Sequence, residues 1–248
     1  MRQRSRLSSM AGSIVSGMSE LLVCELGVVE YREALALQER LRARRQAGEI
    51  EDVLLLLEHP PVYTRGRRSG PGELPMGEDW YRSQGIDVVD TDRGGRVTYH
   101  GPGQLVGYPI VAVGDVVAYV RTLERAMLAA LAESGIAART RTDEGADYTG
   151  VWVEDRKIAS IGVHVARGVG THGFAVNVEN DLQPFEWIVP CGLERVRMTS
   201  VIAERGDPAP GAMPQFRALM ASCFAAAFDR AGRTIAPGEL EAAGVPSR

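Results

Sequence analysis

One cysteine of the chain stands in a setting that suits covalent chemistry. Cys191 lies between Pro190 and Gly192, directly after the apolar residues 187–189. Proline cannot donate a backbone hydrogen bond and glycine adopts backbone angles that other residues avoid, so we expect this thiol on a turn. A thiol there can act as a nucleophile, although most lone cysteines are buried packing residues. Taken alone, Cys191 is therefore better explained as a packing residue than as a nucleophile. A catalytic role needs support from other residues.

Lys157 is the residue that could activate such a thiol. It follows the Asp155-Arg156 turn and opens the largely apolar segment 158–163. A lysine at the end of a strand is usually solvated. A free thiol has a pKa of about 8.5, so a neighbouring ammonium that favours the thiolate, or an amine that takes its proton, would make it reactive. If Lys157 reaches Cys191, the two would titrate as one coupled pair.

Two glycine-rich segments, residues 93–104 and 168–173, are the other candidates for a site. Neither has the pattern of a phosphate-binding loop or of a dinucleotide-binding turn. Their glycines would let the backbone approach a ligand and offer N–H groups to a carbonyl oxygen or an anion. The alternative, that they are simply tight turns, stays open.

The histidines do not favour a metal site. They are His59, His100, His164 and His172. Their spacing lacks the i, i+4 pairing of a helical zinc site, and a lone histidine is more often a hydrogen-bonded structural residue.

Composition bounds the class of protein. The chain has 248 residues, of which 45% are hydrophobic and 24% charged, which suits one sizeable globular domain. It has no apolar run near the ~20 residues that span a bilayer, and its net charge of −4 does not favour nucleic acid as a partner. Its three cysteines are widely spaced, which argues against a disulfide framework and predicts a cytoplasmic protein.

Hydrophobic periodicity predicts alternating strands and helices. We expect strands at 21–26, 53–57, 86–89, 105–111, 150–154, 157–165 and 174–178, and helices at 30–46, 79–84, 116–134 and 213–231. The continuous apolar run 53–57 is typical of a strand buried on both faces of a sheet. The pattern predicts an α/β (α+β) fold, a single domain with a mixed main sheet flanked by helices. We expect residues 1–20 to be a disordered extension, 21–231 the domain and 232–248 a loose tail.

One long motif carries a resemblance to a known family. Residues 93–108, RGGRVTYHGPGQLVGY, closely resemble the signature of the octanoyltransferases of lipoate biosynthesis. The blocks EHPPVYT (58–64), GVWV (150–153), KIASIGV (157–163), THG (171–173) and PCG (190–192) are similar to those of the same family. The resemblance runs in order from about residue 21 to residue 231.

The resemblance implies a fold, a reaction and a site. The fold would be that of the biotin and lipoate protein ligase catalytic domains. The enzyme would move an octanoyl or similar medium-chain acyl group from acyl carrier protein to a lysine of a lipoyl domain. Cys191 matches the family's nucleophile and Lys157 the lysine that activates it. The residues that match the acyl-binding segments are Arg93, Gly94, Gly95, Arg96, Val97, Thr98, Tyr99, His100, Ser160, Ile161, Gly162, Gly173, Phe174 and Ala175.

The resemblance also sets expectations for cofactors and partners. Thioester energy would drive the transfer, so no ATP and no metal would be required. The acceptors would be lipoyl domains of 2-oxo acid dehydrogenase E2 subunits and the glycine cleavage H protein, and the enzyme would be a monomer. Its rivals are an ATP-dependent lipoate–protein ligase, which needs no nucleophilic cysteine, and a non-catalytic domain that binds acyl chains or their carrier protein. Cys191 favours the transferase over the ligase. Thiol labelling would separate the transferase from the binding domain, in which Cys191 would be no more reactive than Cys24 or Cys223, and the role of His164 stays open.

Overall fold

The strand β2 (Asp52–Glu58) shows how the sequence builds the interior. In the computed structural model, which describes residues 19–189, 196–206 and 211–242, the side chains of residues 53–57 are fully buried. Leu54 and Leu56 join one hydrophobic cluster, whereas Val53, Leu55 and Leu57 join a second one on the opposite face. The expectation of a strand covered on both faces is therefore confirmed.

The main sheet is mixed. Within the described residues its strand order is β10-β8-β9-β6-β2-β1-β11, with β7 paired to β8. The pairs β2–β6, β6–β9, β8–β9 and β7–β8 are antiparallel, whereas β1 runs parallel to both β2 and β11, and β10 runs parallel to β8. The bounds are Glu20–Val28 (β1), Gln104–Ile110 (β6), Gly150–Val153 (β7), Arg156–Ala166 (β8), Val169–Asn177 (β9), Arg197–Met198 (β10) and Ala231–Ile235 (β11).

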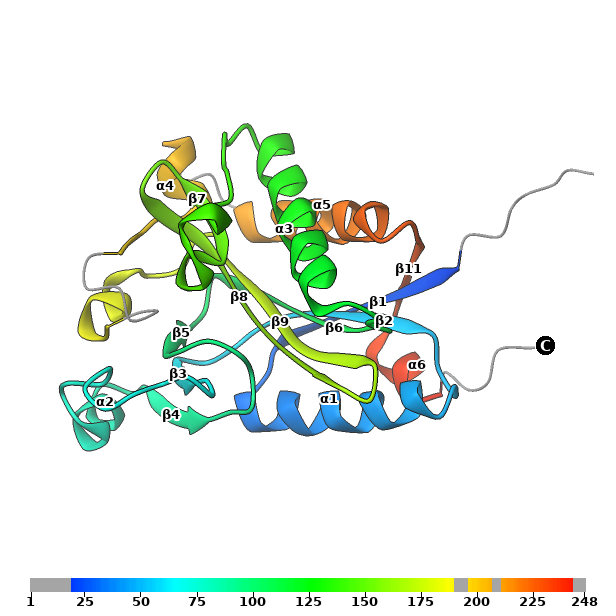
Figure 1. The fold of residues 1–248 in the computed structure, drawn as a ribbon, viewed down its shortest axis with the longest axis horizontal. Coiled ribbons are helices and arrows are strands. Elements are labelled where there is room, and N and C mark those ends of the chain that lie inside the picture. The colour runs from blue at the N-terminus through cyan, green and yellow to red at the C-terminus, as the bar shows by residue number, and fades with distance from the viewer. Residues whose placement is uncertain (1–18, 190–195, 207–210, 243–248) are drawn as a thin grey trace, which may run out of the picture.

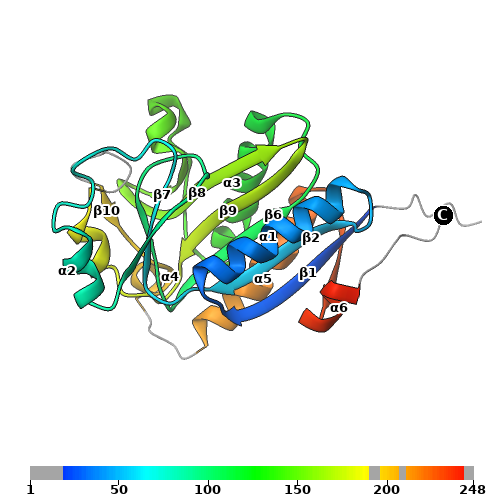
Figure 2. The same ribbon diagram turned by 90° about the horizontal axis from the view of Figure 1, so that it is seen from below.

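Helices cover both faces of this sheet (Figure 1). Helices α3 (Val116–Glu133) and α5 (Ala212–Ala227) pack on one face, and α1 (Tyr31–Gln46) and α6 (Pro237–Ala242) lie on the other, as the view from below also shows (Figure 2). The Asp115 side chain accepts a hydrogen bond of 2.8 Å from the backbone N–H of Ala118 and so caps α3. The expected mixed α/β fold with a mixed sheet flanked by helices is confirmed.

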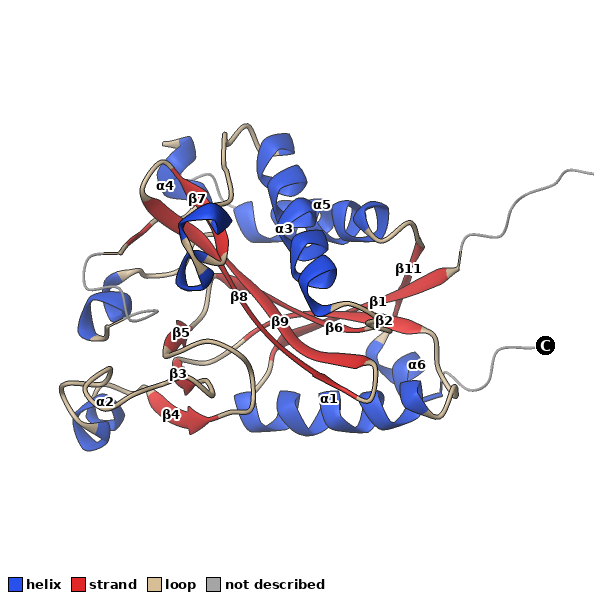
Figure 3. Ribbon diagram, in the orientation of Figure 1, coloured by secondary structure: helices blue, strands red, loops and turns tan. Residues whose placement is uncertain are grey.

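A second, small sheet stands beside the main one (Figure 3). It has the order β4-β3-β5, formed by Asp87–Asp90, Val62–Arg65 and Thr98–His100. Helix α2 (Glu78–Ser83) and the 3-10 turn Gln183–Trp187 belong to its surroundings, and aromatic rings such as Tyr63, Tyr81 and Phe185 form its core. Further short helical segments are Thr142–Glu144, Ala146–Tyr148 and α4 (Val201–Arg205).

The structure corrects three expectations. The described part of the expected loose C-terminal tail forms most of β11, which pairs with β1, and α6, in which Leu240 is buried. Helix α5 ends at Ala227 because the chain then turns into β11, so the predicted helix end at residue 231 is wrong. Residues 169–173 of the second glycine-rich segment lie in β9 and pair with β8, so this strand begins five residues before the predicted start at residue 174.

Some expectations lie outside the described residues. These are the nucleophile Cys191 with its neighbours Pro190 and Gly192, and the disordered extension over residues 1–18. No helix in the part of the chain that the structure describes is both long enough and apolar enough to cross a membrane.

Candidate active site

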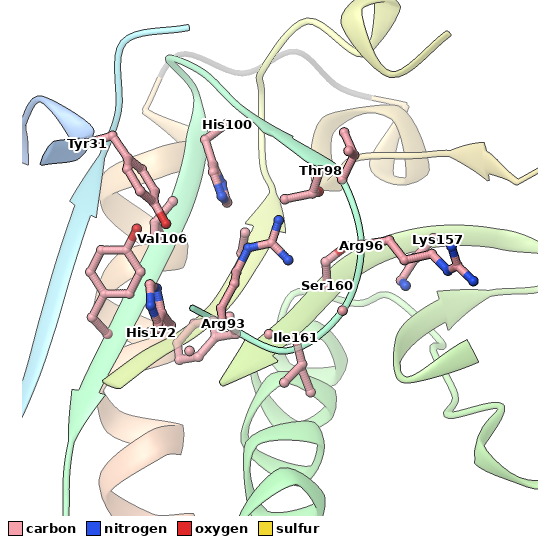
Figure 4. Close-up of a pocket in the computed structure, with 17 residues that line it drawn as sticks. Tyr31, Arg93, Arg96, Thr98, His100, Val106, Lys157, Ser160, Ile161 and His172 are labelled. Carbon is pink, nitrogen blue, oxygen red and sulfur yellow. The ribbon is translucent and has the colours of Figure 1, made fainter. Parts of the chain in front are cut away.

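A pocket of about 520 Å³ lies where the small sheet meets the main sheet. Its walls come from the start of α1, the segment 93–98, and strands β5, β6, β8 and β9 (Figure 4). The residues that line it are Tyr31, Arg93, Gly95, Arg96, Val97, Thr98, His100, Val106, Tyr108, Lys157, Ser160, Ile161, Gly162, His172, Gly173, Phe174 and Ala175.

Lys157 borders this pocket and is almost entirely buried. Its side chain and backbone together are 2% exposed, and Nζ lies 5.3 Å from the centroid of the Trp152 ring. Strand β8 holds it between two neighbours, because Lys157 is in register with Trp152 of β7 and with Met198 of β10. The expectation of a solvated lysine at a strand end does not apply here. The structure places the ammonium inside the protein, where a charge needs an acidic or polar partner.

Gly150 makes room for this lysine. A Cβ added to Gly150 would lie 2.9 Å from Cε of Lys157 and 2.4 Å from the carbonyl oxygen of Ala159. Gly150 also has φ +129, a backbone conformation that favours glycine.

The glycine-rich segment 93–97 lies directly against strand β8. The backbone N–H of Gly94 donates a 2.9 Å hydrogen bond to the carbonyl oxygen of Val163. A Cβ on Gly162 would come within 2.9 Å of the Gly94 carbonyl oxygen, so only a glycine in β8 permits this close approach.

Two charged side chains anchor the same segment. Arg93 is 6% exposed, and its Nη2 donates to the carbonyl oxygen and the hydroxyl of Thr64 at 2.5 and 2.8 Å. Glu73 accepts a 2.7 Å hydrogen bond from Nη1 of Arg96 and one of 3.1 Å from the backbone N–H of Val97. The backbone carbonyl of Glu73 also accepts from the N–H of Val189, two residues before Cys191 in the sequence. Glu73 thus joins the segment 93–97 to the described chain next to the predicted nucleophile.

Most of the predicted acyl-site residues come together around the pocket. Two of them do not line it. Gly94 turns to the Val163 carbonyl, and Tyr99 packs in the core of the small sheet, with its ring centroid 5.5 Å from those of Tyr63 and Phe185. Val97 and Ile161, expected to contact an acyl chain, both line the pocket.

Four lining residues were not predicted from the sequence as part of the site. They are Tyr31, Val106, Tyr108 and His172. His172 could have been predicted, because it lies inside the THG block. Tyr31 and Tyr108 fit the apolar pattern of a core helix and a core strand, and that pattern hides their position at a cavity.

The end of the pocket opposite Lys157 carries a cluster of rings (Figure 4). His59 Nδ1 lies 2.6 Å from the Val29 carbonyl oxygen and therefore carries the proton, so Nε2 accepts from the Tyr108 hydroxyl at 2.7 Å. Tyr31 stacks on His100 with 6.0 Å between ring centroids. Burial lowers the pKa of His59 to about 4 and holds that of His100 well below its usual value. Both rings are therefore neutral near pH 7.

A carboxylate stands behind this cluster. Asp92 Oδ1 lies 2.7 Å from Nε2 of His172, and its Oδ2 lies 2.5 Å from Nδ1 of His164. The hydrogen bond from His172 holds the pKa of Asp92 far below its usual value. His164, whose role the sequence leaves open, thus contacts the same carboxylate from outside the pocket lining.

The arrangement suits a substrate with an apolar chain and one reactive end. Val97, Val106, Ile161 and Phe174 provide apolar walls, and Lys157 stands at one side of them. A second pocket of about 800 Å³ shares Gly95, Arg96 and Gly162 with the first and also reaches Lys157. Lys157 therefore borders both pockets.

Comparisons with known proteins agree with the fold described above. The family model described as the lipoyl protein ligase A/B catalytic domain matches residues 30–225. A protein named octanoyltransferase from Mycobacterium tuberculosis is 46% identical over 226 residues, which cover 89% of this chain and 92% of that protein. Another octanoyltransferase, from Solibacter usitatus, is 51% identical over 175 residues, covering 69% of this chain and 78% of the relative.

A solved structure shows the same fold at low sequence identity. The crystal structure of lipoate-protein ligase A bound with ATP has a TM-score of 0.65 and 18% identity, and the match covers 91% of this chain and 92% of that one. The family match over most of the chain, together with the identity to named enzymes, is decisive: the chain is an acyltransferase that belongs to the octanoyltransferase family, built on the lipoyl protein ligase A/B catalytic domain.

Proposed function

We propose that this enzyme transfers an octanoyl group from acyl carrier protein to a lysine of a lipoyl domain, through a thioester on Cys191. The observation that carries the proposal is the position of Lys157, a buried ammonium that borders an apolar pocket in a member of this family.

In the first step the thiolate of Cys191 attacks the carbonyl carbon of the carrier thioester. The carbon–sulfur bond to the carrier breaks, and the carrier thiol leaves with a proton from the Lys157 ammonium, which becomes a neutral amine. An ammonium close to a thiol favours the thiolate, which is the role we assign to Lys157. In the second step the amine of the acceptor lysine attacks the acyl-enzyme, Lys157 takes up its proton, and the Cys191 thiolate is released.

Each step passes through an oxyanion, which needs hydrogen-bond donors. We assign this role to the backbone N–H groups of Gly95 and Arg96, because those of Gly94 and Val97 already donate to Val163 and Glu73. His100 is less suited to it, because the ring lies on the side of the pocket away from Lys157 and is neutral (Figure 4). The second pocket beside Lys157 supports a separate route for the second substrate.

The proposed reaction also has consequences for cofactors, acceptors and cellular location. Thioester energy makes ATP and metal unnecessary, the acceptors are lipoyl domains of 2-oxo acid dehydrogenase and glycine cleavage proteins, and the enzyme acts as a monomer in the cytoplasm.

The test is to mix the enzyme with octanoyl-acyl carrier protein in the absence of ATP and metal. Mass spectrometry is expected to find one octanoyl mass on the peptide that contains Cys191, and none after Cys191→Ser. A requirement for ATP would instead identify a ligase, and an unmodified Cys191 in a protein that still binds the acyl carrier would identify a binding domain.

A further inference from the structure

The end of the pocket opposite Lys157 contains a buried imidazole nitrogen without a partner. The side chain of His172 is 1% exposed, and its Nε2 lies 2.7 Å from Oδ1 of Asp92. Its Nδ1 is buried and makes no hydrogen bond within the described residues. Buried polar atoms are nearly always hydrogen-bonded, so an exception that lines a pocket indicates a ligand group.

The protonation of His172 defines which group Nδ1 requires. Burial lowers the pKa of His172, so the ring is neutral near pH 7. A neutral ring that faces a carboxylate through Nε2 carries its proton on Nε2. Nδ1 then has a lone pair and can only accept a hydrogen bond.

His100 presents a second nitrogen that can accept a hydrogen bond. Gln104 Nε2 donates to the Tyr99 carbonyl oxygen and to Oδ1 of Asn177, which fixes the orientation of its amide. Its Oε1 therefore accepts from Nδ1 of His100 at 2.7 Å, and Nε2 of this neutral ring is an acceptor. His100 and His172 both lie across the pocket from Lys157 (Figure 4).

The backbone fixes the position of the His172 ring. His172 has φ +55, which is uncommon for a residue other than glycine, and its N–H donates a 2.7 Å hydrogen bond to Oε1 of the buried Gln38. Backbone strain of this kind is retained where the surrounding structure holds a side chain in one required place.

We propose that this end of the pocket recognises a hydrogen-bond donor on the distal end of the acyl chain, with His172 Nδ1 as the principal acceptor and His100 Nε2 as the second. The chemical class of ligand is a medium-chain acyl group with a terminal hydroxyl. The inference deepens the proposed function, since it rests on an acyl chain that lies in this pocket with its carbonyl toward Lys157.

A hydroxyl in a purely apolar pocket loses its hydrogen bonds to water and weakens binding. Next to an unpaired acceptor the hydroxyl regains one hydrogen bond, whereas a methyl group at the same place leaves the acceptor unpaired. A site with such an acceptor favours a chain that ends in a hydroxyl, whereas an apolar pocket favours a chain that ends in a methyl group.

The experiment measures binding of free octanoic acid and ω-hydroxyoctanoic acid to the full-length protein by calorimetry, with matched pairs one carbon shorter and longer. For at least one length, the wild-type protein is expected to bind the hydroxy acid at least as tightly as the plain acid. In His172→Phe the hydroxy acid is expected to bind about tenfold more weakly than the plain acid, because the acceptor is lost while the ring volume is kept.

Two further variants keep the result decisive. His172→Asn places a residue that tolerates positive φ at this position and is expected to lose the preference as well. His164→Asn is the control, because His164 contacts the same Asp92 but lies outside the pocket lining. This variant is expected to keep the preference for the hydroxy acid.

The inference is overturned if the wild-type protein binds every hydroxy acid about tenfold more weakly than its plain partner, or if the His172 variants weaken both acids equally. Binding of the free acids does not involve Cys191. The same variants are then assayed for transfer: a protein that shows the binding preference but forms no thioester contradicts the proposed function alone, and one that transfers octanoyl without any preference contradicts this inference alone.

Discussion

A Cβ on Gly150 would lie 2.9 Å from Cε of Lys157, so the backbone of β7 and the side chain of the predicted catalytic lysine occupy adjoining space. The position of the ammonium therefore depends on the absence of a side chain in a neighbouring strand. Gly150 belongs to the GVWV block, and this contact gives a physical reason for glycine there.

Gly150→Ala is expected to displace Lys157 and to abolish most of the transfer activity. The control is Gly145→Ala, because Gly145 has a similar φ of +120 but no atom within 4 Å of an added Cβ. Each substitution introduces backbone strain of about 1–3 kcal/mol. Thermal unfolding is expected to show a loss of stability in both variants, while the acylation rate falls only in Gly150→Ala. Equal rates in the two variants would show that Lys157 does not depend on this contact.

Lys157→Ala is expected to slow acylation of Cys191 by a factor of about 100 or more, as is usual when a group that activates a nucleophile is removed. The pH profile of Cys191 alkylation is expected to move to higher pH, since the thiolate loses its neighbouring ammonium. Cys24 and Cys223 serve as internal controls, because burial raises the pKa of each to about 11. A Cys191 profile that does not change would mean that Lys157 has no influence on the thiol.

Glu73→Ala is expected to weaken donor binding more than it weakens the fold. The change removes the acceptor for Arg96 and for the N–H of Val97, while the backbone bond to Val189 remains. We expect a several-fold increase in KM for octanoyl-carrier protein and a loss of about 1–3 kcal/mol in stability. Glu78→Ala is the control, since Glu78 pairs with Arg65 and Arg82 at the surface. If the two variants have the same KM, the anchor does not shape the site.

Stability is expected to fall as the pH drops from about 6.5 toward 4. The pKa of His59 is lowered by burial from 6.5 to about 4, so in this range the unfolded chain binds a proton that the folded chain does not. The loss of stability begins near pH 6.5 and amounts to about 3 kcal/mol by pH 4. Urea unfolding of His59→Gln is expected to show a shallower pH dependence than the wild type. Tyr108→Phe loses the same hydrogen bond but keeps the titrating ring, so its slope is expected to match the wild type.

The elements that the sequence predicted well are those with strong local patterns. The apolar run 53–57, the capped helix after Asp115 and the hairpin around Asp155 all appear with ends close to the predicted ones. Strand β11 was missed because its sequence, AGRTI, has little hydrophobic pattern and its first four residues are exposed. It becomes a strand only by pairing with β1, which lies about 200 residues earlier in the chain.

The part of the site that lies within recognisable sequence motifs was predictable. The glycine-rich segment and β8 come from recognisable blocks, and the structure brings them together around one pocket. Tyr31 and Tyr108 could not be found in this way, because a tyrosine in a core helix or strand has the same local pattern whether it faces a neighbour or a cavity. Only the packing of α1 against the sheet decides between them.

The burial of Lys157 has a further consequence for an enzyme whose product is an acylated amine. Of the 28 lysine and arginine residues in the sequence, Lys157 is the only lysine. The enzyme's surface cations are therefore arginines, whose guanidinium groups stay protonated and do not compete as nucleophiles near neutral pH. The proposed thioester on Cys191 would therefore meet no exposed lysine of this sequence, either in the same molecule or in another copy. In the proposed reaction this composition would protect the enzyme from acylating itself and would leave the lysines of other proteins as the acceptors.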